Sequence, residues 1–149
     1  MKKLFGFLLI MTVIAVFIPK RLSKIEIYAT SLFAMTLGKT VDEILDIKLN
    51  LYGFFHKGVD YLGILVQIIS YPVVSLLFLN YFPYHMKTRY KVFYILIWSV
   101  LTMVLEKISY HTKFFYYNRW KWWYSVLIYP VVYTILALNF SFIRKLTTR

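Results

Sequence analysis

The segments YLGILVQIISYPVVSLLFLNYF (residues 61–82) and WWYSVLIYPVVYTILALNFSFI (residues 122–143) decide the fold of this chain. Neither segment contains Lys, Arg, Asp or Glu. A helix rises about 1.5 Å per residue and the hydrocarbon layer of a bilayer is about 30 Å thick, so about 20 apolar residues are needed to cross it. Both segments are long enough, and they predict two transmembrane helices.

Two weaker segments, one between these two and one before them, predict further spans. Residues 92–105 form an uncharged run that ends at Glu106, and the helical pattern continues to about Tyr110. Residues 25–46 are uncharged only from 27 to 38. We therefore expect a third clear span and a fourth helix whose second half is polar on one side.

The N-terminal residues 4–18 form an apolar run flanked by basic residues, a pattern that also fits a secretory signal peptide. Cleavage requires small residues at the scissile position, whereas this run ends in Val-Phe-Ile-Pro (residues 16–19), so we predict a retained short helix. The fold prediction is an all-α, polytopic integral membrane protein with about five transmembrane helices. It is a single membrane domain over residues 1–149, divided into a first helix (4–19), hairpin one (24–83) and hairpin two (88–145).

The composition supports a membrane location. Hydrophobic residues make up 60% of the chain and charged residues only 16%, which is far from the balance of soluble proteins. The net charge of +12 comes from basic residues at the ends of the apolar runs, a distribution typical of contacts with anionic lipid headgroups and not of nucleic-acid binding. Compact basic clusters in the short loops favour a cytoplasmic C-terminus in a cell membrane.

A possible internal repeat relates the two hairpins. Asp46 lies eight residues before a Phe-Phe pair at 54–55, and Glu106 lies eight residues before Phe-Phe at 114–115. Each unit then carries a Tyr-Pro-Val-Val motif, at 71–74 and at 129–132. Coincidence in a chain rich in these residues is the alternative. Proline removes a backbone donor from a helix, so we expect kinks at Pro72 and Pro130.

Five of the six acids fall near one membrane face, and with a lysine they form the predicted polar cluster: Lys39, Asp42, Glu43, Asp46, Asp60 and Glu106. A charge at membrane depth costs on the order of 3 kcal/mol or more, so these side chains should face each other or a wet cavity. One interpretation is a network of salt bridges that fixes helix packing. The other is an ion, proton or substrate site built from Asp46 and Glu106, with Asp60 as a further candidate.

Catalytic and metal motifs are absent from the sequence. Candidates for chemistry are Asp46 and Glu106 as bases and His111 as a proton carrier, but no nucleophile elbow or phosphate loop accompanies them. His56 and His111 lack the spacing of metal ligands, so we predict neither a metal nor another cofactor. The aromatic residues Trp120, Trp122, Trp123 and Tyr124 alternate with cations, as at a headgroup interface, although a carbohydrate or peptide surface could use the same residues.

Over residues 24–145 the chain resembles a family of small multi-pass membrane proteins found in endospore-forming bacteria. The residues that carry the resemblance are the stretch 46–60, the Tyr-Pro helix, Glu106 and the run WKWWYS at 120–125. The resemblance implies a bacterial inner-membrane location and supplies no catalytic residue.

The leading functional prediction is a non-enzymatic accessory, scaffold or small transport-related component, which assembles with itself or with a larger membrane partner. The first alternative is a membrane-embedded enzyme that acts on lipid or envelope precursors through the acidic cluster. The second alternative is an ion or proton conductor.

Overall fold

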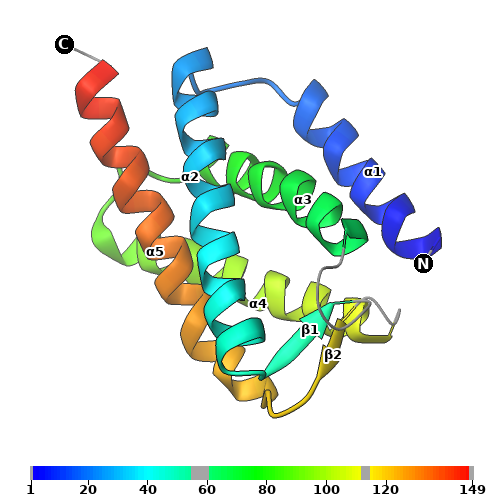
Figure 1. Cartoon of the computed structure of the whole chain (residues 1–149). Coiled ribbons are helices and arrows are strands. Elements are labelled where there is room, and N and C mark those ends of the chain that lie inside the picture. The colour runs from blue at the N-terminus through cyan, green and yellow to red at the C-terminus, as the bar shows by residue number, and fades with distance from the viewer. Residues whose placement is uncertain (1, 55–60, 112–114, 148–149) are drawn as a thin grey trace.

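The computed structural model describes residues 2–54, 61–111 and 115–147, and Figure 1 shows their arrangement. The chain is mostly helical. Two short strands, β1 (Tyr52–Phe54) and β2 (Phe115–Tyr117), form an antiparallel ribbon that the all-α prediction did not include. The helical elements are α1 (Lys2–Phe17), α2 (Lys24–Asp42), the π-helical turn η1 (Glu43–Lys48), α3 (Tyr61–Asn80), α4 (Thr88–His111) and α5 (Trp122–Thr147).

Three of the helices, α3, α4 and α5, are long and apolar enough to cross a membrane. Much of their apolar surface faces outward, as at Phe93 and Val100 of α4, which are 64% and 58% exposed. Lipid is the solvent that such a surface requires. Within the described residues α1 offers only a short apolar stretch and α2 carries four charged residues, so the structure supports three of the five predicted spans.

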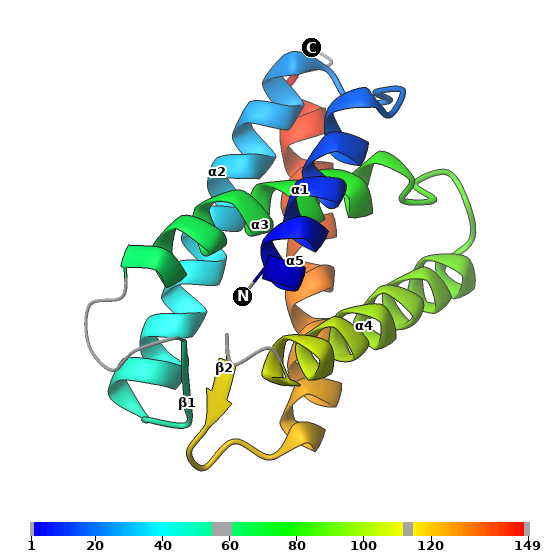
Figure 2. The same cartoon turned by 90° about the vertical axis from the view of Figure 1, so that its right-hand side faces the viewer.

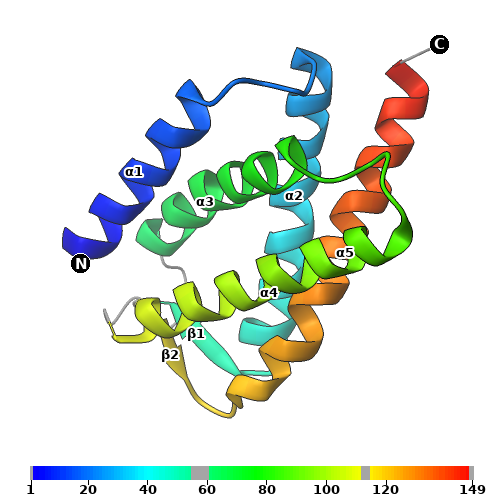
Figure 3. The same ribbon diagram turned by 180° about the vertical axis from the view of Figure 1, so that it is seen from behind.

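The helices pack as two neighbouring pairs. Helix α2 makes its largest contact with α3, and α4 makes its largest contact with α5. The pairs are joined because α2 and α5 lie side by side and run in opposite directions, with α3 and α4 crossing them steeply (Figures 1 and 2). Helix α1 packs on α3 at the edge of the molecule, as the view from behind shows (Figure 3).

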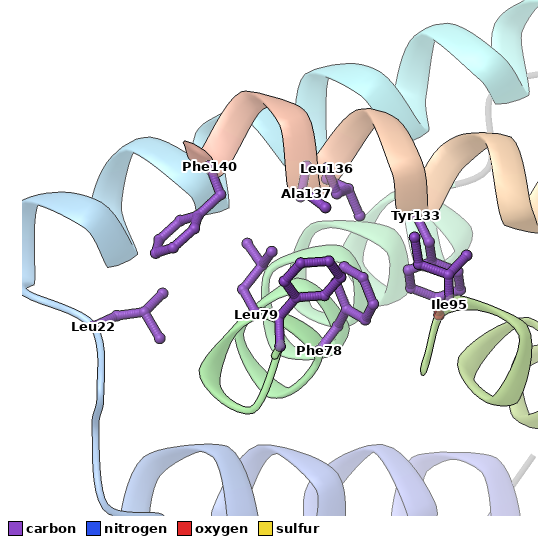
Figure 4. Packing of buried hydrophobic residues seen from close by; sticks show 10 residues of the cluster. Leu22, Phe78, Leu79, Ile95, Tyr133, Leu136, Ala137 and Phe140 are labelled. Carbon is purple, nitrogen blue, oxygen red and sulfur yellow. The ribbon is translucent and has the colours of Figure 1, made fainter. Parts of the chain in front are cut away.

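The main core lies where α3, α4 and α5 meet (Figure 4). Phe78 and Phe140 are fully buried there, and the ring of Phe78 lies 4.6 Å from that of Tyr133. The Tyr94 hydroxyl donates to the Phe78 carbonyl at 2.9 Å. Lipid tails are as apolar as these side chains, so close packing and not exclusion of water holds the membrane-embedded part together.

An ion pair fastens α2 to α5 at the end where α2 begins. Ser23 and Glu26 form a capping box, in which the Ser23 amide donates to Glu26 at 2.7 Å. The other Glu26 oxygen accepts from Arg144 Nε at 2.9 Å, and the Arg144 guanidinium lies 4.6 Å from the centre of the Phe140 ring. In the part of the chain that the structure describes, this is the one ion pair.

The ribbon fastens the two pairs at the opposite end. The Leu51 carbonyl accepts from three successive amides, those of residues 118, 119 and 120, at 2.8–3.0 Å. The absence of a side chain at Gly53 leaves room for the hydroxyl end of Tyr116, its partner on β2. The segments that follow η1 and α4 are thus in contact through backbone hydrogen bonds as well as rings.

Both prolines lie inside helices that continue through them, Pro72 in α3 and Pro130 in α5. The hydroxyls nearest to the prolines have other partners than the carbonyls that the prolines free. Ser70 reaches the Gln67 carbonyl at 3.5 Å, and the tyrosines that precede the prolines bond to carboxylates.

Candidate functional site

Asp42, the last residue of α2, is held by two tyrosine hydroxyls. Tyr52 of β1 donates to Oδ1 at 2.6 Å, and Tyr71 of α3 donates to Oδ2. Both carboxylate oxygens therefore act as acceptors, which is the arrangement of an ionised aspartate. Its partners all belong to hairpin one.

Glu106, near the end of α4, is held in the same way by hairpin two. Tyr129 of α5 donates to Oε2 at 2.5 Å, and Tyr117 of β2 donates to Oε1. Ser125 adds a third hydroxyl, which donates to Oε1 at 3.1 Å. Hydroxyl groups again surround a carboxylate at the end of a helix.

The two arrangements are equivalent parts of the predicted repeat. Tyr52 and Tyr117 are direct partners in the ribbon, so their side chains lie on the same face of it. Tyr71 and Tyr129 are the tyrosines of the two Tyr-Pro motifs. The sequence spacing paired Asp46 with Glu106, whereas in the structure Asp42 occupies the place that corresponds to Glu106.

Close approach of α2 and α3 lets Tyr71 reach Asp42. Ala34, Gly38 and Asp42 follow one another at intervals of four residues and therefore lie on one face of α2. A Cβ atom on Gly38 would lie only 2.6 Å from ring carbons of Tyr71. The tyrosine ring thus occupies the space that the missing side chain leaves.

Both carboxylates line one cavity of about 310 Å³ between the two hairpins. Most of its wall is apolar and comes from all five α-helices, with Phe7, Leu8 and Met11 of α1 on one side. Ser75 of α3 also lines it and is only 1% exposed, and its Oγ has no hydrogen-bond partner in the described structure. The cavity therefore combines an apolar wall with a few fixed polar groups, as ligand sites do.

The tyrosines on the ribbon stay protonated. Burial raises the pKa of Tyr52 far above its ordinary value, and the negative charge of Asp42 raises it further. Burial likewise raises the pKa of Tyr117, with a further contribution from its hydrogen bond to Glu106. Both hydroxyls are therefore permanent donors to the carboxylates.

The predicted salt-bridge network is not what holds Asp42 and Glu106. Among the described residues neither carboxylate pairs with a cation, and Lys39 instead donates to the Gln67 side chain at 2.7 Å. Glu43 is exposed and Asp46 is partly exposed in η1. Asp60 and His56 lie outside the described residues.

A second cavity of about 260 Å³ shares Glu106 and Ser125 with the first. Its wall includes Lys107, His111, Tyr117 and Trp122. His111 is exposed, and its ring lies 5.7 Å from that of Tyr110. No three His, Asp or Glu side chains come together to hold a metal ion in the described parts of the chain.

The four aromatic residues predicted at the headgroups divide into two groups. Trp122 and Trp123, at the start of α5, are 69% and 45% exposed. Trp120 turns inward, where its ring lies 5.2 Å from that of Tyr52 and its Nε1 donates to Ser125 at 3.1 Å. Tyr124 packs against both Trp120 and Trp123.

Sequence reasoning missed Tyr52, Tyr117 and Ser75 as parts of the site. A signal for the two tyrosines was present, because Tyr52 follows Asp42 by ten residues and Tyr117 follows Glu106 by eleven. For Ser75 the sequence offers no comparable signal, since helical serines commonly bond to their own backbone.

No protein-family model, curated protein or solved structure matches this chain.

Proposed function

We propose that this protein is a non-enzymatic, small transport-related membrane component that binds a small ligand in the cavity between its hairpins. The observation that carries the proposal is that Asp42 and Glu106, one from each hairpin, line the same largely apolar cavity. Charged residues at membrane depth that face a cavity mark substrate or ion pathways.

The contacts of the carboxylates favour binding over catalysis. Every oxygen of Asp42 and Glu106 already accepts a hydrogen bond from a hydroxyl, so each group is held as a fixed acceptor. His111, the expected proton carrier, is exposed and does not line the cavity that the two acids share. Fixed, ionised acceptors suit recognition of a ligand.

The packing of α2 and α1 supports five spans. Helix α2 lies along α5, which is long and apolar enough to cross a membrane, so α2 is at the same depth, and α1 packs on α3. We place the protein in a bacterial cell membrane, with the basic residues at the helix ends on anionic headgroups and the C-terminus in the cytoplasm. The same proposal includes membership of the family of small multi-pass membrane proteins found in endospore-forming bacteria. It also includes assembly of the protein with itself or with a larger membrane partner.

A pair of matched variants tests ligand binding. Val132 lines the cavity, whereas its neighbour Val131 is 57% exposed on the lipid-facing side of α5. Thermal unfolding of the purified protein in detergent would be followed with a panel of cationic, neutral and anionic amphipathic small molecules. At least one class should raise the unfolding temperature of the wild type and of Val131→Phe, and have no effect on Val132→Phe, in which the ring fills the cavity.

A panel with no effect on the folded wild-type protein would overturn the proposal. The same conclusion would follow if every stabilising compound acted equally on Val132→Phe, because binding would then lie elsewhere.

A membrane-embedded enzyme is the second candidate, and the observation that favours it is that Glu106 lines both the main cavity and the one whose wall includes His111 and Lys107. An acid that lines two cavities could pass a proton from one to the other. The readout is whether a variant restores the phenotype of a strain that lacks the gene. If the protein is an enzyme, His111→Asn should fail to restore it and should still be stabilised by the ligand. If the protein only binds a ligand, His111→Asn should restore the phenotype and be stabilised as the wild type is.

A further inference from the structure

The charge balance of the cavity restricts the kind of ligand that it can bind. Asp42 and Glu106 bring two negative charges to a largely apolar wall. Within the described residues no cation forms a salt bridge with either group; Lys39, one helical turn before Asp42, attracts that carboxylate only from a distance and gives its hydrogen bond to Gln67. A buried charge that no cation contacts is costly, and a ligand that carries a positive charge would offset the cost.

The carboxylates retain capacity to accept from a ligand. A carboxylate has about four acceptor positions, and Asp42 uses one on each oxygen for Tyr52 and Tyr71. The rings of these tyrosines and of Trp120 also line the cavity. Aromatic faces attract cations by a further 0.5–2 kcal/mol, roughly, which adds to the preference for positive charge.

Ser75 gives an independent indication of a ligand. Other buried helical hydroxyls have partners, as Ser99 does in the Ile95 carbonyl at 2.8 Å, Thr30 in the Glu26 carbonyl at 2.6 Å and Ser125 in Glu106 at 3.1 Å. The Ser75 hydroxyl lines the cavity and has no such partner. Leaving a buried hydroxyl unpaired costs about 1–3 kcal/mol, and a polar atom of a bound molecule would remove that cost.

We propose that the cavity binds a protonated amine with an apolar body, an inference that rests on the proposed ligand-binding function. The ammonium group lies between Asp42 and Glu106 and donates to their free acceptor positions. The apolar body lies against the hydrocarbon wall formed by Met11, Val74, Val132 and Leu136. The Ser75 hydroxyl accepts from a second ammonium proton.

The test compares two probes that differ in charge and little in shape, 4-phenylbutylamine and 4-phenylbutanol. Their binding to the full-length protein in non-ionic detergent at pH 7 would be measured by isothermal titration calorimetry. We expect the amine to bind at least tenfold more tightly than the alcohol. Asp42→Asn with Glu106→Gln should weaken the amine at least tenfold and leave the alcohol within about twofold, because each amide keeps the shape and one acceptor oxygen of the carboxylate but carries no charge.

Two further variants separate the roles of individual groups. Glu43→Gln removes an exposed acid next to Asp42 and should leave the affinity for the amine unchanged. Ser75→Ala should weaken the amine severalfold, since it removes an acceptor inside the cavity. Thermal unfolding and gel filtration would show that each variant is folded, and the comparison of the two probes on the wild type needs no variant.

The outcomes distinguish this inference from the function on which it rests. If the alcohol binds as tightly as the amine, and Val132→Phe abolishes both, the cavity binds ligands but the preference for a cation is wrong. If neither probe binds, while neutral or anionic compounds of the panel stabilise the wild type, the cavity still binds ligands but the assignment of an amine as the ligand is wrong. If the amine binds but Val132→Phe leaves its affinity unchanged, both the amine site and the cavity function are overturned.

Discussion

At the scale of single residues, tyrosine hydroxyls allow Asp42 and Glu106 to lie inside an apolar fold. Each carboxylate receives neutral donors at both oxygens, so its negative charge is dispersed over hydrogen bonds without being cancelled. A cation in the same place would close the site to a ligand. This difference has consequences for stability that single substitutions can measure.

Tyr129→Phe should destabilise the protein by about 1 kcal/mol, because it removes a donor from Glu106 and keeps the ring. The effect would be measured by reversible unfolding in mixed micelles. Tyr28→Phe is the matched control, since Tyr28 is 67% exposed and its hydroxyl loss should change stability little. Equal effects of the two substitutions would contradict the role assigned to Tyr129.

Gly38→Ala should destabilise the protein by about 1–3 kcal/mol, because the added methyl group would lie 2.6 Å from the Tyr71 ring and push it away from Asp42. Gly6→Ala is the control, since no atom lies within 4 Å of the corresponding position in α1. That substitution should be neutral or slightly stabilising, because alanine favours helix more than glycine does. Unfolding measurements on both variants check the prediction, which fails if Gly38→Ala is as stable as the wild type.

At the scale of elements, the sequence predicted helices well and the ribbon not at all. Uncharged runs of about 20 residues predict helices in lipid because a membrane-embedded backbone must satisfy its own hydrogen bonds. A three-residue strand such as Phe115–Tyr117 exists only because Tyr52–Phe54 pairs with it, and such a distant partner has no local pattern. The choice of Asp42 over Asp46 depends on the same ribbon, which brings Tyr52 to the end of α2.

The contact between the ends of α2 and α5 makes a further prediction. Glu26→Gln keeps the capping box with Ser23, which glutamine can also form, but removes the charge that pairs with Arg144. We expect a loss of about 1–2 kcal/mol, reduced from the value for a fully buried pair because the Arg144 side chain is 31% exposed. Glu43→Gln, at an exposed acid, should show no loss in the same unfolding assay.

At the scale of the whole molecule, the membrane crossing of α2 is the point on which the five-span arrangement depends. The chain has no cysteine, so single cysteines can be introduced without a background. If α2 crosses the membrane, Lys24→Cys and Lys48→Cys should react with an impermeant reagent from opposite sides. Labelling of both from one side would show that α2 does not cross the membrane, and the five-span arrangement would be wrong.

Each carboxylate finds all its hydroxyl donors within its own hairpin: Asp42 from Tyr52 and Tyr71, Glu106 from Tyr117, Ser125 and Tyr129. During biosynthesis, each half of the chain can therefore enter the lipid with its acid already bound by a tyrosine of its own hairpin, Tyr71 for Asp42 and Tyr129 for Glu106, and the ribbon between the halves then fixes Tyr52 and Tyr117. Neither half has to wait for the other before insertion. Genes encoding residues 1–86 and 87–149 separately should, when expressed together, yield an assembled protein that co-purifies.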